Sequence, residues 1–248
     1  MSIAPETVGA SRPTYTQPLV ANACTSRSRI MALILVSFVS FAQFILASAY
    51  SKGGASTAVN QRMAEVRVLL GLVSEVGSLG VLWYVLFAQA RGWASIGWDF
   101  RLRDLADGIG LFFVGNIAAR LLVAFVQAAY ISVSGHRPAI NSIHGMLGYG
   151  ISTVSVVFVL LNPFFEEMIV RGYLMSEVLD LGGGGILALF VSVTLQMSYH
   201  SYQGLIRCVG LAAFFCIYSI YFLKKRRIAP VVFAHLLMDA LFLLRGAS

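Results

Sequence analysis

Residues 162–173 read NPFFEEMIVRGY and place two adjacent carboxylates, Glu166 and Glu167, at the end of a long apolar run. Ionisable side chains within a membrane span are costly, and they usually face protein or water rather than lipid. A pair of them is therefore a functional-site hypothesis by default. The alternative is a cluster of charges on a surface loop beside the membrane. Pro163 fits either interpretation, because a proline kink frees backbone carbonyls that need polar or wet surroundings at membrane depth.

Helix geometry separates the two glutamates. Neighbouring helical residues project about 100° apart, whereas residues four apart share one face, so Glu167 can pair with Arg171 in the favourable acid-first order. Glu166 stays outside this pair. We therefore predict an ion pair of Glu167 and Arg171 that locks the helix, and a Glu166 carboxylate that turns into a cavity and carries protons.

The composition places the chain in a membrane. Its 248 residues are 58% hydrophobic and 12% charged, and the mean hydropathy is +0.80, whereas soluble domains are roughly half apolar and a quarter charged. The sequence predicts an all-α, polytopic transmembrane helical bundle. The net charge of +7 does not indicate nucleic-acid binding, because the basic residues lie between apolar runs, where they determine topology. The three cysteines have no CxxC spacing and indicate neither a disulfide framework nor a Cys-ligated zinc site.

About seven apolar runs can serve as spans, and they follow a polar tail, residues 1–29, that we expect to be flexible. The predicted spans cover roughly 30–50, 66–90, 108–134, 146–179, 186–200, 205–223 and 228–244. The first three form a block of N-terminal transmembrane helices, residues 30–145. The tail and the even-numbered connections hold most basic residues, including a cluster at 224–227. The positive-inside rule therefore predicts a multi-pass protein with a cytoplasmic N-terminus, and we expect the membrane to be the bacterial cell membrane.

Two of the first three predicted spans also carry ionisable residues. Glu75 lies in the second span, where it serves a proton path or, as we favour, bonds a neighbouring helix. Arg120 lies in the third span, and we expect it to pair with Glu75 because each is costly when unpaired. His136 and His144 lie in the next connection without ligand spacing, so we interpret them as solvated.

Three groups in the last hundred residues could face Glu166. His200 ends the fifth predicted span, and His235 and Asp239 are four apart, on one helical face of the seventh. We expect these residues to share one site that activates water. A carboxylate beside a histidine can take a proton from water and deliver it to a leaving amine, while donors across the cavity hold the oxyanion. Alternatively, the four side chains could bind a divalent metal such as zinc, which lowers the pKa of bound water.

These motifs resemble those of a known family. In order and spacing, EExxxR at 166–171, the helix-terminal His200, and HxxxD at 235–239 after PVVFA are similar to the three motifs of the CPBP family. This family comprises CAAX prenyl endopeptidases and bacteriocin-processing or immunity enzymes, often called Abi proteins. The resemblance covers roughly residues 148–244. It implies that residues 146–248 form a CPBP-like catalytic transmembrane core of four helices.

The resemblance also implies roles for these residues. Glu166 is expected to be the general base that activates water, and His200 its catalytic partner. His235 and Asp239 are expected to stabilise the oxyanion or to bind metal. Glu167 and Arg171 are expected to support the site.

Two positions depart from the family pattern. Gln196 stands where the family often has Phe, which alters the lining or the hydrogen bonding of the cavity. Asp239 stands where Asn is common. An ionised Asp239 cannot donate a hydrogen bond to an oxyanion, so it is protonated, orients His235 or binds a metal. The family has been described both as metalloproteases and as glutamate-dependent proteases, so metal dependence stays open.

We therefore predict an intramembrane endopeptidase, a hydrolase that cuts membrane-associated or CAAX-type protein substrates with water activated by glutamate and histidine. Its expected partners are the lipid bilayer and a membrane protein or peptide substrate. One alternative is a non-proteolytic immunity or regulatory protein that retains the polar site. Another is a proton-coupled transporter in which Glu75, Arg120 and Glu166 form a relay.

Overall fold

The computed structural model describes residues 25–52, 61–138 and 152–246, and every regular element among them is helical. This confirms the predicted all-α fold. The α-helices are α1 (Ser26–Lys52), α2 (Gln61–Ala88), α3 (Arg103–Ser134), α4 (Thr153–Glu167), α5 (Ser176–Asp180), α6 (Gly185–His200), α7 (Leu205–Lys225) and α8 (Ala229–Gly246). A π-helical segment (Met168–Met175) joins α4 to α5, and short 3-10 turns occupy Trp93–Ile96 and Ser201–Gln203.

Each predicted span corresponds to a helix, and the fourth corresponds to α4, the π-helical segment and α5 together. Five of these helical stretches are long and apolar enough to cross a membrane: Ser26–Tyr50, Glu65–Ala88, Arg103–Ser134, Thr153–Asp180 and Leu205–Lys225. Helix α6 and the apolar part of α8, Ala229–Leu241, are shorter. Residues 1–24 of the tail expected at 1–29, the start of the fourth span and His144 lie outside the described residues. The expectation is wrong for residues 26–29, which form the first turn of α1.

The outer face of the bundle is apolar, as a lipid environment requires. Large side chains such as Phe38 on α1, Phe87 on α2 and Phe125 on α3 are about 70% exposed, at 68%, 69% and 71%. In water such a surface would mark an interaction site or an aggregation liability. In a bilayer it is the expected lipid-facing surface, so the fold is an integral multi-pass membrane bundle.

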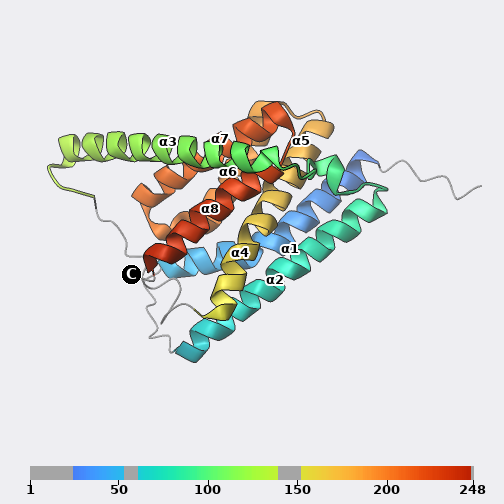
Figure 1. Ribbon diagram of the computed structural model, residues 1–248, viewed down its shortest axis with the longest axis horizontal. Coiled ribbons are helices and arrows are strands. Elements are labelled where there is room, and N and C mark those ends of the chain that lie inside the picture. Colours follow the sequence, from blue (N-terminus) through green and yellow to red (C-terminus); the bar gives the residue numbers. More distant parts are fainter. Residues whose placement is uncertain (1–24, 53–60, 139–151, 247–248) are drawn as a thin grey trace, which may run out of the picture.

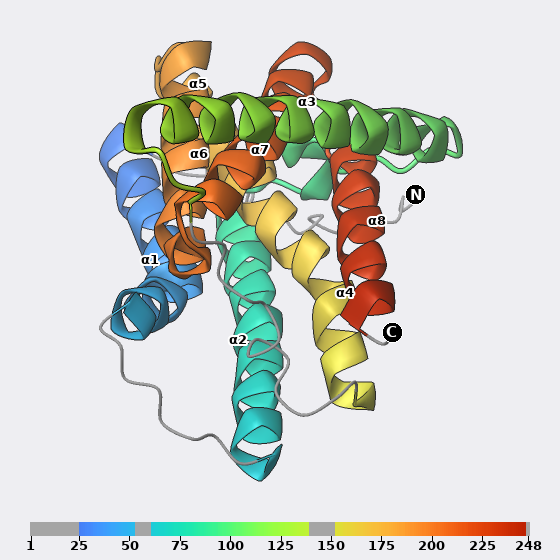
Figure 2. The same ribbon diagram turned by 90° about the vertical axis from the view of Figure 1, so that its left-hand side faces the viewer.

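Helix α4 occupies the middle of the bundle. Figure 2 shows α4 between α2 and α8, and it packs against both. Helix α3 crosses over α7 and α8 in the same view. Glycines allow this crossing, because a Cβ atom at Gly108 would lie 2.8 Å from the ring of Phe233, and one at Gly115 would lie 2.5 Å from the ring of Phe214. Small residues at such crossings let helix backbones approach closely.

One end of the bundle gathers the connections that carry most basic residues (Figure 1). Arg29 of α1 and Arg91 after α2 both pair with the buried carboxylate of Glu177 on α5. Arg227, between α7 and α8, pairs with Asp104 at the start of α3, with Nη2 and Oδ2 2.6 Å apart. These contacts place the tail-proximal end of α1 and three connections on one side, as the span count predicts. Which compartment this side faces stays a prediction.

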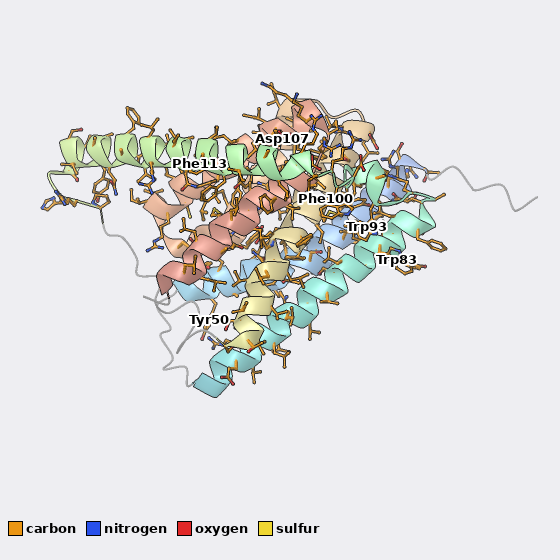
Figure 3. All side chains as sticks on the ribbon, viewed as in Figure 1. Tyr50, Trp83, Trp93, Phe100, Asp107 and Phe113 are labelled. Carbon is orange, nitrogen blue, oxygen red and sulfur yellow. The ribbon has the colours of Figure 1, made fainter. Side chains whose placement is uncertain are left out.

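Aromatic side chains are found toward both ends of the bundle. Figure 3 shows Trp83, Trp93 and Phe100 toward the end of the molecule where α2 finishes, and Tyr50 toward the other end. Trp83, Phe100 and Tyr50 are each more than half exposed, at 55%, 56% and 67%. Tryptophan and tyrosine are enriched at both membrane interfaces, because their rings are amphipathic.

Candidate active site

The site is built where α4 passes into the π-helical segment. Pro163 lies inside α4 and has no N–H, so the carbonyl of Val159 loses its regular helical partner. The π-helical turns follow directly after Glu167, and such turns are frequent at functional sites. Glu166 is 3% exposed and Glu167 is fully buried. The polypeptide therefore holds both carboxylates inside protein, away from lipid, which excludes the surface-loop interpretation.

Glu167 forms the predicted ion pair. Nη1 of Arg171 donates to Oε1 of Glu167 at 2.9 Å, and both side chains are fully buried. The same oxygen lies 2.7 Å from Nδ1 of His235 on α8, a contact that the sequence did not predict. Arg171 is also held by Phe215 of α7, which offers its backbone carbonyl at 3.4 Å and its ring at 4.9 Å. Glu167 thus joins α4 to α8 and fixes the orientation of His235.

Glu166 stays outside that ion pair and faces His200. Its Oε1 atom lies 3.9 Å from Nε2 of His200, at the end of α6. Its Oε2 atom accepts a hydrogen bond from Nε2 of Gln196 at 3.0 Å. Gln203 donates from Nε2 to Nδ1 of His200 at 3.1 Å, so a neutral His200 carries its proton on Nε2, the nitrogen that faces Glu166. The glutamate and the histidine are therefore arranged to exchange a proton through a small molecule between them.

His235 and Asp239 share one face of α8, as their spacing predicts. Nε2 of His235 lies 3.7 Å from Oδ1 of Asp239. Nδ1 of His235 is committed to Glu167, so Nε2 is the nitrogen that can address a substrate. The 3.7 Å separation is longer than a hydrogen bond, and it is Glu167, rather than Asp239, that holds the ring in place.

The ring of Phe215 contacts both histidines of the site, His200 of the Glu166–His200 pair and His235 of the His235–Asp239 pair. The ring of His200 stacks near it with centroids 5.6 Å apart, and the ring of His235 meets it edge-on at 6.1 Å. The Phe215 side chain is fully buried. Sequence reasoning missed this residue, because one Phe within an apolar helix carries no chemical signal that distinguishes it from its neighbours.

The four candidate ligands do not converge on one point. In the ranges that the structure describes, no three His, Cys, Asp or Glu side chains are grouped so that they could hold a metal ion. The Nε2 atoms of His200 and His235 face two different carboxylates, those of Glu166 and Asp239. The donor set expected for zinc therefore does not fit a single ion in this arrangement.

The pairing expected for Glu75 is wrong. Arg120 is exposed on α3 and forms no ion pair with Glu75, which is fully buried on α2. Without Arg120 the proposed transporter relay is broken. The partner of Glu75 is instead Asn162, whose amide nitrogen satisfies Oε1 of Glu75 at 3.0 Å and Oε1 of Glu166 at 3.2 Å. The four-residue spacing of Asn162 and Glu166 on α4 could have revealed the contact between these two residues from the sequence.

Comparison with known proteins bears directly on this region. Residues 149–241 match the model of a family described as type II CAAX prenyl endopeptidase Rce1-like. The matched segment runs from just before α4 into α8 and excludes α1 to α3. It contains both candidate pairs, Glu166 with His200 and His235 with Asp239. No curated protein and no solved structure matches the chain. The motifs, the helical membrane fold and this match agree in the similarity of residues 149–241 to type II CAAX prenyl endopeptidases, and the match covers less than half of the chain.

Proposed function

We propose that this protein is an intramembrane endopeptidase that hydrolyses membrane-associated or CAAX-type protein substrates with water activated by Glu166 and His200. The observation that carries the proposal is the 3.9 Å separation between Oε1 of Glu166 and Nε2 of His200. This distance is too long for a direct hydrogen bond and suits two groups that address one water molecule. The family whose model residues 149–241 match implies a protease, and that supports the same chemistry.

Glu166 acts as the general base. Oε2 accepts from Gln196, and Oε1 accepts from Asn162 and also faces Nε2 of His200, so Oε1 is the oxygen that takes the proton from water. Gln203 holds Nδ1 of His200, so Nε2 of the ring points at the same place. The water oxygen bonds to the scissile carbonyl carbon, the proton taken from water is delivered to the peptide nitrogen, and the C–N bond then breaks to release the amine and the carboxylic acid. Buried Glu166 of α4 and partly buried His200 of α6 thus supply both proton-transfer steps.

His235 stabilises the developing oxyanion by donating a hydrogen bond to it. Glu167 accepts the Nδ1 proton of its ring, so donation from Nε2 uses the doubly protonated imidazole. A fixed donor aimed at the oxyanion stabilises the transition state most where water is excluded, and His235 is 2% exposed. Glu167 and Arg171 are positioning residues in this scheme, because they act through His235.

The experiment uses the purified full chain in lipid nanodiscs. Wild type, Glu166→Gln and His200→Ala are incubated with a farnesylated CAAX peptide and with a library of unprenylated peptides, and the products are read by mass spectrometry. We expect wild type to cleave and both variants to lose cleavage while remaining monodisperse. Asp99→Asn makes a carboxyl-to-amide change at an exposed position and serves as the control with full activity.

Retention of full activity by both site variants would refute the proposal. Failure of wild type to cut either substrate set would instead favour the non-proteolytic membrane protein. Cleavage of the farnesylated peptide alone would narrow the substrate class to prenylated proteins.

A further inference from the structure

Glu75 is a buried acid of α2 that lies outside the family-matched segment yet reaches the active site. Its side chain is fully buried, and its Oε2 atom has no hydrogen-bond partner. None of the ion pairs between described residues includes it. A buried carboxyl group within a membrane span is costly and is a functional-site hypothesis by default, which a single neutral hydroxyl such as that of Ser78 is not.

The packing of α2 on α4 brings Glu75 to the site. Gly71 lies one helical turn before Glu75, and a Cβ atom at Gly71 would lie 2.8 Å from the ring of Phe158 on α4. Phe158 in turn lies one helical turn before Asn162. Because residues four apart share a face, the close contact of Gly71 with Phe158 sets Glu75 opposite Asn162. The two helices therefore approach each other closely next to the polar contact.

Asn162 connects the two carboxylates. Its amide satisfies its neighbours only when its nitrogen faces Oε1 of Glu75 at 3.0 Å and Oε1 of Glu166 at 3.2 Å. An amide nitrogen has two hydrogens, so one can go to each carboxylate. Gln196 holds the other oxygen of Glu166 at 3.0 Å. The carboxylate of Glu166 is thus held between two amides, one of which is anchored by Glu75.

We propose that Glu75 is a positioning residue for the reaction, which fixes the Asn162 amide and through it the orientation of the Glu166 carboxylate toward His200. The proposal rests on the proposed function of Glu166 as general base. A catalytic group must keep its geometry closely, and its rotamer is kept by neighbours that are themselves hydrogen-bonded. Helix α2 thereby takes part in the chemistry although the family match does not include it.

The test compares two substitutions at Glu75. Glutamine keeps an oxygen acceptor and the shape of the side chain, whereas methionine keeps the length and removes the acceptor. We expect Glu75→Gln to retain kcat within about threefold, and Glu75→Met to lose on the order of 10–100-fold in kcat with an unchanged KM, because misplacement of a catalytic group by about 1 Å has effects of this size. Ser78→Ala removes another buried, unpartnered oxygen from α2 and should leave kcat unchanged.

Asn162→Ala breaks the same link from the α4 side, so it keeps the proposal testable if Glu75→Met does not fold. We expect the double variant to be no slower than Asn162→Ala alone, because residues that act through one contact are not additive. Unchanged kcat in Glu75→Met or Asn162→Ala would overturn the proposal. So would losses that multiply in the double variant, or a Glu75→Gln enzyme as slow as Glu75→Met.

Wild type and Glu166→Gln are assayed in parallel, which separates this proposal from the proposed function. If these two differ and the Glu75 variants match wild type, only the positioning role fails. If wild type does not cleave, the proposed function fails, and the unfolding temperatures of wild type, Glu75→Met, Asn162→Ala and the double variant still measure the contact. Less-than-additive shifts are expected, and additive shifts would contradict the link.

Discussion

Glu166→Gln and Glu167→Gln make the same chemical change at adjacent positions, yet the structure predicts opposite phenotypes. Glu167 neutralises Arg171 at 2.9 Å, and both side chains are fully buried. Its removal leaves a buried guanidinium whose remaining contacts are the carbonyl and the ring of Phe215. Glu166 forms no ion pair with an arginine or a lysine among the described residues, and its partners are two amides and His200.

The magnitudes follow from these partners. Removing one partner of a buried ion pair costs about 3–5 kcal/mol, because the other charge stays buried and uncompensated. For a chain of this length about 2–4 °C of unfolding temperature corresponds to each kcal/mol, so Glu167→Gln should lower Tm by roughly 6–20 °C. Glu166→Gln replaces hydrogen bonds between a carboxylate and neutral amides by hydrogen bonds between amides and leaves no buried charge uncompensated, so it should cost about 1 kcal/mol, or up to roughly 4 °C.

The assay measures thermal unfolding in detergent by intrinsic fluorescence and cleavage in nanodiscs on the same preparations. Glu166→Gln is expected to be stable and inactive. Glu167→Gln is expected to be unstable and, where folded, to keep part of its activity, because glutamine still offers an oxygen to His235. The double variant Glu167→Gln/Arg171→Met should regain stability, because it removes the uncompensated charge.

A Glu167→Gln protein that unfolds at the temperature of wild type would refute the reasoning, since the ion pair would then contribute nothing. Equal destabilisation by the two single substitutions would also refute it, because it would mean that the two glutamates are not separated in role. Failure of Arg171→Met to restore stability to Glu167→Gln would show that the loss comes from His235 instead.

Three further outcomes are expected. Gln196→Phe installs the residue that is common in the family and removes the donor to Oε2 of Glu166, so kcat should fall about tenfold, as the loss of one charge-assisted hydrogen bond implies; a variant as fast as wild type would show that this amide does not position the base. Chelation with 1,10-phenanthroline should leave cleavage intact, and metal analysis should find no stoichiometric zinc, because the candidate ligands are not grouped around one point; inhibition reversed by added zinc would contradict this. Glu177→Gln removes the charge and one of the two carboxylate oxygens shared by Arg29 and Arg91 at the basic end of the bundle, and it should cost about 1–3 kcal/mol of stability without changing KM, measured by thermal unfolding and cleavage kinetics; a large change in KM would show that this end contacts substrate.

The sequence by itself determined the features that depend on local periodicity. Composition and long apolar runs required helices in a bilayer, because only internally hydrogen-bonded backbones can span it. Helical spacing of four predicted the Glu167–Arg171 pair, which is confirmed. The same spacing predicted the shared face of His235 and Asp239, which is also confirmed. Resemblance of the motifs predicted the family, which the comparison with known proteins supports.

Only the tertiary structure decided how residues on different helices meet. Glu167 accepts from His235, 68 positions away, and no periodicity in the sequence encodes that distance. Arg120 is as costly a residue as Glu75, so the sequence paired them, yet the crossing of α3 leaves Arg120 at the surface. The physical reason is that the free-energy cost of burying a charged group requires some partner for it, whereas the packing of apolar helix faces determines which partner lies within reach. At Glu75, the close contact of Gly71 with Phe158 brings α2 near enough to α4 for Asn162 to be the partner of Glu75.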